Sequence, residues 1–240
     1  MKRILLAGIL LSGLVLAQTP PSASLLLEEG QRELSLMWTS SYQHKTQVDE
    51  PSGQFDYDCS GFVDYALKKV APAAYKELPI SKASAKRPLA QDFYNFFSSL
   101  TGSSLTGSRL TGSSLTGSRL TGKTAHWEPI GKATDLKPGD LVSWLRPPDN
   151  DSNNTGHVML VRARAALNPR DPQEVLVEVL DSTTSPHAQD SRAQGQSGLG
   201  IGTIGILTDA AGQALAYHWR GGLSRKEEAT PIAFGRLLER

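Results

Sequence analysis

The sequence has very little cysteine: Cys59 is the single one among 240 residues. A chain with one thiol cannot form an internal disulfide, so its fold depends on packing and hydrogen bonds. The same shortage excludes zinc sites built from several cysteines. A lone thiol is either packed as a small apolar residue or retained for its reactivity, and the residues around Cys59 must decide between these uses.

An excess of charge of one sign is also missing. The chain carries 25 lysines and arginines against 24 aspartates and glutamates, which gives a formal net charge of +1. The sequence shows no basic cluster that would mark a nucleic-acid or anionic membrane surface. We therefore expect no nucleic acid as a partner.

The hydrophobic run near the N-terminus is too short to span a bilayer. It extends from Ile4 to Leu16, whereas a membrane-spanning helix needs about 18 apolar residues or more. Lys2 and Arg3 precede the run and the small residue Ala17 follows it, which is the pattern of a secretory signal. We expect residues 1–17 to be a signal peptide, the mature protein to be secreted or periplasmic, and no stable membrane insertion.

Helical patterns come first in the remaining chain and strand patterns follow. Apolar residues at helical spacing predict helices over 24–38, from Cys59 or Ser60 to the residues before Pro72, and over 89–97. Alternating or apolar runs then predict strands over 140–145, 157–162, 174–180, 201–207 and 214–219. This order indicates an α+β fold. We expect an N-terminal extension over 18–40 and one domain over 41–240.

A low-complexity repeat interrupts that domain. Residues 98–122 repeat the unit Ser-(Ser/Arg)-Leu-Thr-Gly five times. The regular leucines resemble those of the pentapeptide-repeat family, whose units stack into a β-solenoid. Four units make one coil of that solenoid, so five cannot cover a core of their own. A surface loop rich in Ser, Thr and Gly is the favoured interpretation.

Three residues predict nucleophilic chemistry. Cys59 stands at the expected start of a helix, where unpaired N–H groups favour a thiolate. His157 opens a strand after a glycine and is a suitable base near neutral pH. Asp181 ends the next expected strand and can fix the tautomer of the imidazole. His187, in the polar loop that follows, is a rival for this third position, and a strand-end turn is the alternative role for Asp181.

At this point the motifs resemble a family. Asp58-Cys59-Ser60-Gly61-Phe62-Val63, Leu136-Lys137-Pro138-Gly139-Asp140-Leu141-Val142 and Gly156-His157-Val158, in that order, look like the NlpC/P60 papain-like cysteine peptidases. The resemblance implies exported enzymes that hydrolyse amide bonds in peptidoglycan stem peptides. It implies a papain-like α+β fold whose N-terminal helices pack on an antiparallel sheet.

The same resemblance assigns roles to individual residues. Cys59 would be the nucleophile, His157 the base and Asp181 the polar third member, with the backbone N–H of Cys59 helping to bind the oxyanion. Tyr42, Asp58 and Ser60 would contact the substrate, Asp58 through a substrate amine. Two features depart from the family. Tyr42 is followed by Gln43-His44-Lys45-Thr46 in place of a glycine pair, and the third position is more often histidine there.

No cofactor or metal is expected. His187 and Asp190 could supply ligands, but the sequence contains no His-Glu-x-x-His run. The acidic segment 149–154 lacks the glycine and glutamate of a calcium loop. The sequence thus predicts an exported cysteine amidase or endopeptidase that acts through a thioester. A catalytically silent domain that binds cell-wall fragments, and an acyltransferase that uses the same residues, remain alternatives. The oligomeric state stays open.

Overall fold

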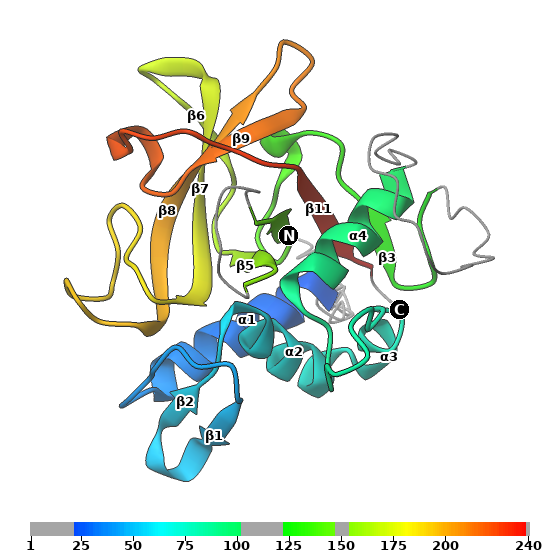
Figure 1. Cartoon of the computed structure of the whole chain (residues 1–240), viewed down its shortest axis with the longest axis vertical. Helices are drawn as coiled ribbons and strands as arrows, with labels where there is room; N and C mark the ends of the chain where they lie inside the picture. Colours follow the sequence, from blue (N-terminus) through cyan, green and yellow to red (C-terminus); the bar gives the residue numbers. More distant parts are fainter. Residues whose placement is uncertain (1–21, 102–121, 147–153, 239–240) are drawn as a thin grey trace, which may run out of the picture.

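A computed structural model of the chain describes residues 22–101, 122–146 and 154–238 (Figure 1). The expected signal peptide, most of the repeat and most of the acidic segment 149–154 lie outside the described residues. In the described part, no helix is both long enough and apolar enough to cross a membrane.

One antiparallel sheet of nine strands dominates the structure. Eight of the strands follow the order β10-β9-β8-β7-β5-β4-β11-β3, and β6 pairs with β7 outside this path. The strands are β3 (Trp127–Pro129), β4 (Leu141–Leu145), β5 (Gly156–Val161), β6 (Ala166–Asn168), β7 (Asp171–Thr183), β8 (Gly198–Thr208), β9 (Ala214–His218), β10 (Glu228–Ala229) and β11 (Ile232–Leu237).

The prediction of a papain-like α+β fold is wrong, because this sheet makes the fold β-rich with few helices. The five expected strands are present as β4, β5, β7, β8 and β9, but β7 and β8 run to 13 and 11 residues and pair over ten positions. The other four strands, of two to six residues, escaped prediction. β3, β6 and β10 have only two or three residues, too few to show a clear alternation of apolar and polar positions, whereas β11 takes its place by pairing with β3 and β4.

The sheet curls so that strands distant in its order face each other. Trp144 on β4 stacks on Tyr217 of β9, with ring centroids 4.1 Å apart, although three strands separate β4 from β9 in the sheet. Alternation along the strands divides the apolar residues between two cores. In β5, Val158 and Leu160 face the helices, whereas Met159 and Val161 join the second core, inside the curl.

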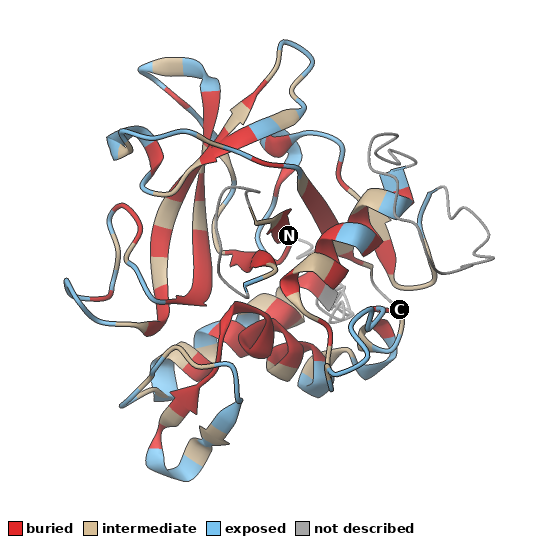
Figure 2. Cartoon of the chain, in the orientation of Figure 1, coloured by how far each residue is buried: buried red, intermediate tan, exposed pale blue. Residues whose placement is uncertain are grey.

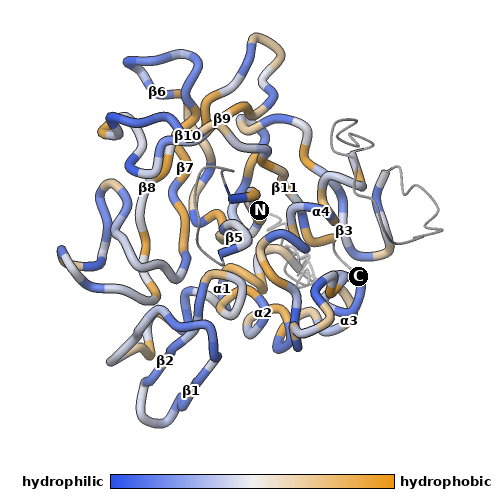
Figure 3. The backbone as a smooth tube through the Cα atoms, viewed as in Figure 1, coloured by the Kyte–Doolittle hydropathy of each residue, from blue (hydrophilic) through white to orange (hydrophobic). Residues whose placement is uncertain are grey.

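Few helices cover the outer face of this curl, namely α1 (Ser22–Leu36), α2 (Cys59–Val70), the short α3 (Pro72–Tyr75) and α4 (Ala90–Thr101). Figure 1 shows α1 and α2 side by side beneath the sheet, with the hairpin of β1 (Gln47–Asp49) and β2 (Gln54–Asp56) projecting beyond them. Buried residues gather where α2 and the long strands meet (Figure 2), and the same region is largely hydrophobic (Figure 3).

Close packing of α1 explains the glycine in the middle of this helix. A Cβ atom at Gly30 would lie 2.9 Å from Leu180 and 3.1 Å from Phe62. Gly30 therefore costs helix propensity but lets α1 approach both α2 and the sheet. α2, which begins at Cys59, packs on α1 and on β5, the strand that carries His157.

Candidate active site

Cys59 is the first residue of α2, as expected from its sequence setting. Asp58 caps the helix, because its Oδ1 accepts a hydrogen bond of 2.7 Å from the backbone N–H of Gly61. The Cys59 side chain is only 3% exposed. Burial raises the pKa of its thiol well above the usual value, and the Asp58 carboxylate raises it further. The backbone N–H groups of Val158 and Ser60 favour the anion but offset this only in part.

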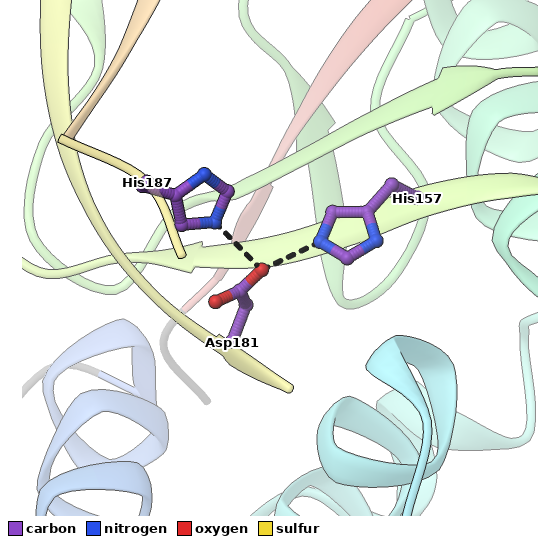
Figure 4. A group of neighbouring side chains, drawn as sticks. All are labelled: His157, Asp181 and His187. Atoms are coloured by element: carbon purple, nitrogen blue, oxygen red, sulfur yellow. Dashed lines mark hydrogen bonds and ion pairs between the residues drawn. The ribbon is translucent and has the colours of Figure 1, made fainter. Parts of the chain in front are cut away.

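His157 lies on β5, where its Cα is paired with Trp144 of β4. Gly156 precedes it with φ near +142°, and a Cβ atom there would lie 2.0 Å from the carbonyl oxygen of Trp144. Only glycine fits this close approach, so the Gly-His pair sets the start of the strand. The Nε2 atom of His157 is 2.6 Å from Oδ2 of Asp181 (Figure 4). The other ring nitrogen, Nδ1, points away from Asp181 and has no hydrogen-bond partner among the described residues (Figure 4).

Asp181 lies near the end of β7 and its side chain has no exposed surface. Burial alone would raise the pKa of this carboxyl. The positive charge of His187, hydrogen bonds from His157 and His187, and the charge of Arg192 together outweigh burial and lower the pKa well below its usual range. Arg192 Nη2 is 3.0 Å from Oδ1 of Asp181. The carboxylate is therefore ionised and fixed on both oxygens.

His187 joins the same network instead of replacing Asp181. Its Nε2 atom is 3.0 Å from Oδ2 of Asp181, and its Nδ1 atom is 3.0 Å from the backbone carbonyl of Trp219 (Figure 4). A carbonyl and an ionised carboxylate both only accept hydrogen bonds, so both nitrogens of His187 carry protons. Both candidates for the third catalytic position therefore belong to one hydrogen-bonded chain. Asp181 contacts His157, and His187 contacts Asp181.

Tryptophan rings enclose the His157 imidazole. Its centroid lies 5.7 Å from that of Trp144 and 5.2 Å from that of Trp219. Trp219 also packs on His187, at 4.2 Å. These rings exclude water from the pairing of His157 with Asp181, so the interaction is stronger than it would be at the surface.

The two histidines and Asp181 could instead hold a metal ion. One ligand atom from each of His157, Asp181 and His187 lies within 4.8 Å of the others, and a histidine that binds metal often donates its second N–H to a carbonyl, as His187 does to Trp219. The guanidinium of Arg192 disfavours this interpretation, because it already neutralises the carboxylate that a cation would need.

The structure brings Cys59 to the backbone of β5 but not into a hydrogen bond with His157. Among the described residues, the Cys59 sulfur is stabilised by the N–H of Val158, the residue that follows His157. Cys59 lines a cleft of about 620 Å³ and His157 lines a second cleft of about 320 Å³. Tyr42 lines both clefts, so the two hollows adjoin and one extended ligand could contact both side chains.

The remaining residues expected to contact substrate surround Cys59. Tyr42 is half-buried, and Ser60 is buried and lines the larger cleft with Asp58. Asp58 was expected to meet a substrate amine. Its Oδ1 instead accepts a hydrogen bond of 2.7 Å from Arg87, and its Oδ2 lies 3.0 Å from Nδ1 of His44.

Sequence reasoning missed Arg87 entirely. It precedes α4 and reaches back to the start of α2, where its Nη1 atom donates to Ser60 Oγ at 2.6 Å and to Asp64 at 3.3 Å. No local motif marks a contact between residues 29 positions apart, as Asp58 and Arg87 are. Only the tertiary fold shows that the start of α2 is electrostatically balanced by this guanidinium.

The fold and site thus define a β-rich protein with a buried cysteine beside a buried His-Asp-His network. No protein-family model and no solved structure matches the chain. The chain is 27% identical over 201 residues to the uncharacterized protein R653 of Acanthamoeba polyphaga mimivirus, an alignment that covers 75% of this chain and 77% of that protein. This similarity assigns no activity to the chain.

Proposed function

We propose that the protein is an exported cysteine hydrolase that cleaves amide or peptide bonds, with Cys59 as nucleophile, His157 as base and Asp181 as the residue that orients His157. The observation that carries the proposal is the hydrogen bond of 2.6 Å from His157 Nε2 to the buried Asp181 carboxylate. That bond leaves Nδ1 as the basic nitrogen of a correctly fixed imidazole. The resemblance of the three motifs to NlpC/P60 peptidases supports peptidoglycan stem peptides as substrates.

In the proposed reaction, the Cys59 sulfur attacks the carbonyl carbon while its proton passes to Nδ1 of His157. The imidazolium is stabilised by the Asp181 carboxylate and then gives its proton to the leaving amine as the C–N bond breaks. Water next attacks the thioester, again with His157 as base, which releases the acid and restores the thiol. The backbone N–H of Cys59 helps to stabilise the oxyanion of each tetrahedral intermediate.

The raised pKa of Cys59 sets a condition on this proposal. The resting enzyme holds a neutral thiol, so the proton must leave as the sulfur attacks, and not in an earlier equilibrium. Side chains in an unliganded site are often too far apart and approach only when substrate binds. We expect substrate in the adjoining clefts to bring His157 and Cys59 together.

One observation favours a second candidate function. A thiol that is 3% exposed and has a raised pKa is also typical of a packed, unreactive cysteine. On that interpretation the clefts bind cell-wall fragments without cleaving them. Such binding would survive Cys59→Ser, whereas hydrolysis would not.

Mass spectrometry of purified peptidoglycan incubated with the protein tests the proposal. We expect new fragments that differ from their parents by one water at one amide bond, and no such fragments with Cys59→Ser or His157→Ala. Cysteine-independent release of the same fragments would contradict the proposal. Fragment binding without hydrolysis by the parent protein would favour the silent binding domain.

A further inference from the structure

The cleft beside Cys59 is strongly positive in a protein of almost balanced charge. Two acidic residues line it, Asp58 and Asp64, although the whole chain has a net charge of only +1. The cationic side chains that line it are Lys45, Lys68, Lys82, Lys86 and Arg87. Like charges gathered around one hollow repel one another, and their combined field attracts anions.

The two acidic residues offset little of this charge. Arg87 binds both of them, at 2.7 Å from Asp58 and 3.3 Å from Asp64. Burial raises the pKa of Asp64 to about 8, which reduces its negative charge near neutral pH. One carboxylate and one guanidinium therefore cancel, and the lysines determine the charge that a ligand meets.

Three of the lysines are exposed and available to a ligand. Within the described part of the chain, Lys45, Lys82 and Lys86 make no ion pair. Lys68 differs, because its ammonium lies over the ring of Tyr75, 4.7 Å from the centroid. Lysine carries its charge on a flexible four-carbon stem, so these ammonium groups can reach carboxylates at several spacings.

The position of Arg87 also argues against a cationic ligand. A substrate amine directed at Asp58 would approach a carboxylate that already accepts a hydrogen bond of 2.7 Å from Arg87. It would also meet the field of the surrounding lysines. Leu89 and Ala90 supply an apolar stretch of wall in the same cleft, against which a peptide chain can lie between its charged groups.

We propose that this cleft binds an acidic peptide, two or more of whose carboxylates are held by Lys45, Lys82 and Lys86. The inference rests on the proposed function, which places a peptide carbonyl at the Cys59 sulfur. It adds the substrate class: the enzyme selects peptides by negative charge and disfavours those with a free amine at Asp58.

Binding of labelled peptides to the full chain carrying Cys59→Ser tests the proposal without turnover. The probes are a fluorescein-labelled hexapeptide with three glutamates, the same peptide with glutamines, and an oligonucleotide with the same number of charges. At low salt we expect the glutamate peptide to bind about tenfold more tightly than the glutamine peptide. That preference should shrink as salt is added.

Charge-reversed variants locate the binding. Lys82→Glu combined with Lys86→Glu should abolish the preference for glutamate. Lys132→Glu, an exposed lysine that lines neither cleft, should leave it intact. Equal binding of the glutamate and glutamine peptides, or an unchanged preference in the double variant, would overturn the proposal. Equal affinity for the oligonucleotide would also overturn it, because the cleft would then select any polyanion.

The parent protein separates this inference from the proposed function. Tight binding of the acidic peptide without cleavage would leave the cleft assignment standing and refute the hydrolase. Cleavage of the glutamate and glutamine peptides at equal rates would support the hydrolase and refute the cleft assignment.

Discussion

The carboxylate of Asp181 lies 2.6 Å from Nε2 of His157; Asp181 has no exposed surface and His157 is 6% exposed, where it lines the smaller cleft. Both oxygens of Asp181 are bonded to cationic or N–H donors, so the residue cannot rotate away from the imidazole. The pair therefore works as one unit, in which the charge of Asp181 fixes the tautomer of His157 and stabilises its protonated form.

The Asp181→Asn variant should show that the charge matters and not only the shape. An asparagine amide can present its N–H to Nε2, which would place the ring proton on Nδ1 and leave no base for the thiol. We predict that hydrolysis falls by about 10²-fold or more, and that the variant is less stable because His187 and Arg192 lose their shared partner. Steady-state kinetics and urea unfolding measure the two effects. Asp49→Asn, at an exposed residue, is the matched control and should change neither.

His187 is expected to act as a positioning residue through Asp181. His187→Gln removes the positive charge that helps to hold the pKa of Asp181 low and changes a hydrogen bond that fixes its Oδ2 atom, so the carboxylate orients His157 less firmly. We predict a lower kcat with little change in KM and a shift of the pH profile. A purely structural role for His187 would lower the amount of folded protein but leave the pH profile of the folded fraction unchanged.

Two buried acids make stability depend on pH. Burial raises the pKa of Glu33 and of Asp64 to about 8 each, whereas in the unfolded chain both would titrate near 4. Between these values the native state holds protons that the unfolded state has lost. The contribution of these two groups to stability therefore falls as pH rises from about 4 to 8 and levels off above that, by about 1 kcal/mol per pH unit for each group.

Urea unfolding between pH 5 and pH 9 measures this slope. Glu33→Gln and Asp64→Asn should each flatten it, because an amide does not titrate. Glu227→Gln, at an exposed glutamate, should leave it as in the parent protein. A slope that is unchanged in both buried variants would show that the two acids are already ionised at neutral pH.

Chelation distinguishes the hydrogen-bonded network from a metal site. If Arg192 and His187 neutralise Asp181 as the geometry indicates, treatment with EDTA should leave hydrolysis and thermal stability unchanged. Loss of activity on chelation, restored by zinc and absent in His187→Gln, would instead assign a metal to His157, Asp181 and His187.

Local patterns in the sequence predicted part of this arrangement. The helix that begins at Cys59 and the strands that carry His157 and Asp181 follow from capping, glycine and alternation signals that act over a few residues. The sequence did not predict the β-rich class. β3 and β11 are strands because they pair with strands distant in the sequence, and their own composition does not mark them.

Long-range contacts account for the rest of what the sequence did not reveal. Arg87 neutralises Asp58 from a separate loop. Arg192 and His187 meet at Asp181 only because β7 and β8 are long and paired, which folds the loop between them back on the carboxylate. No pattern of residue spacing in the sequence predicts the contact of Arg87 with Asp58 or those of Arg192 and His187 with Asp181.

Labelling of Cys59 by a thiol-directed amide mimic tests most directly whether His157 activates this sulfur. We predict that the parent protein is labelled at least about 10²-fold faster than His157→Ala, since only the parent has a base to take the thiol proton as the bond forms. Equal, slow labelling of the two proteins would contradict it and would leave Cys59 as a packed thiol.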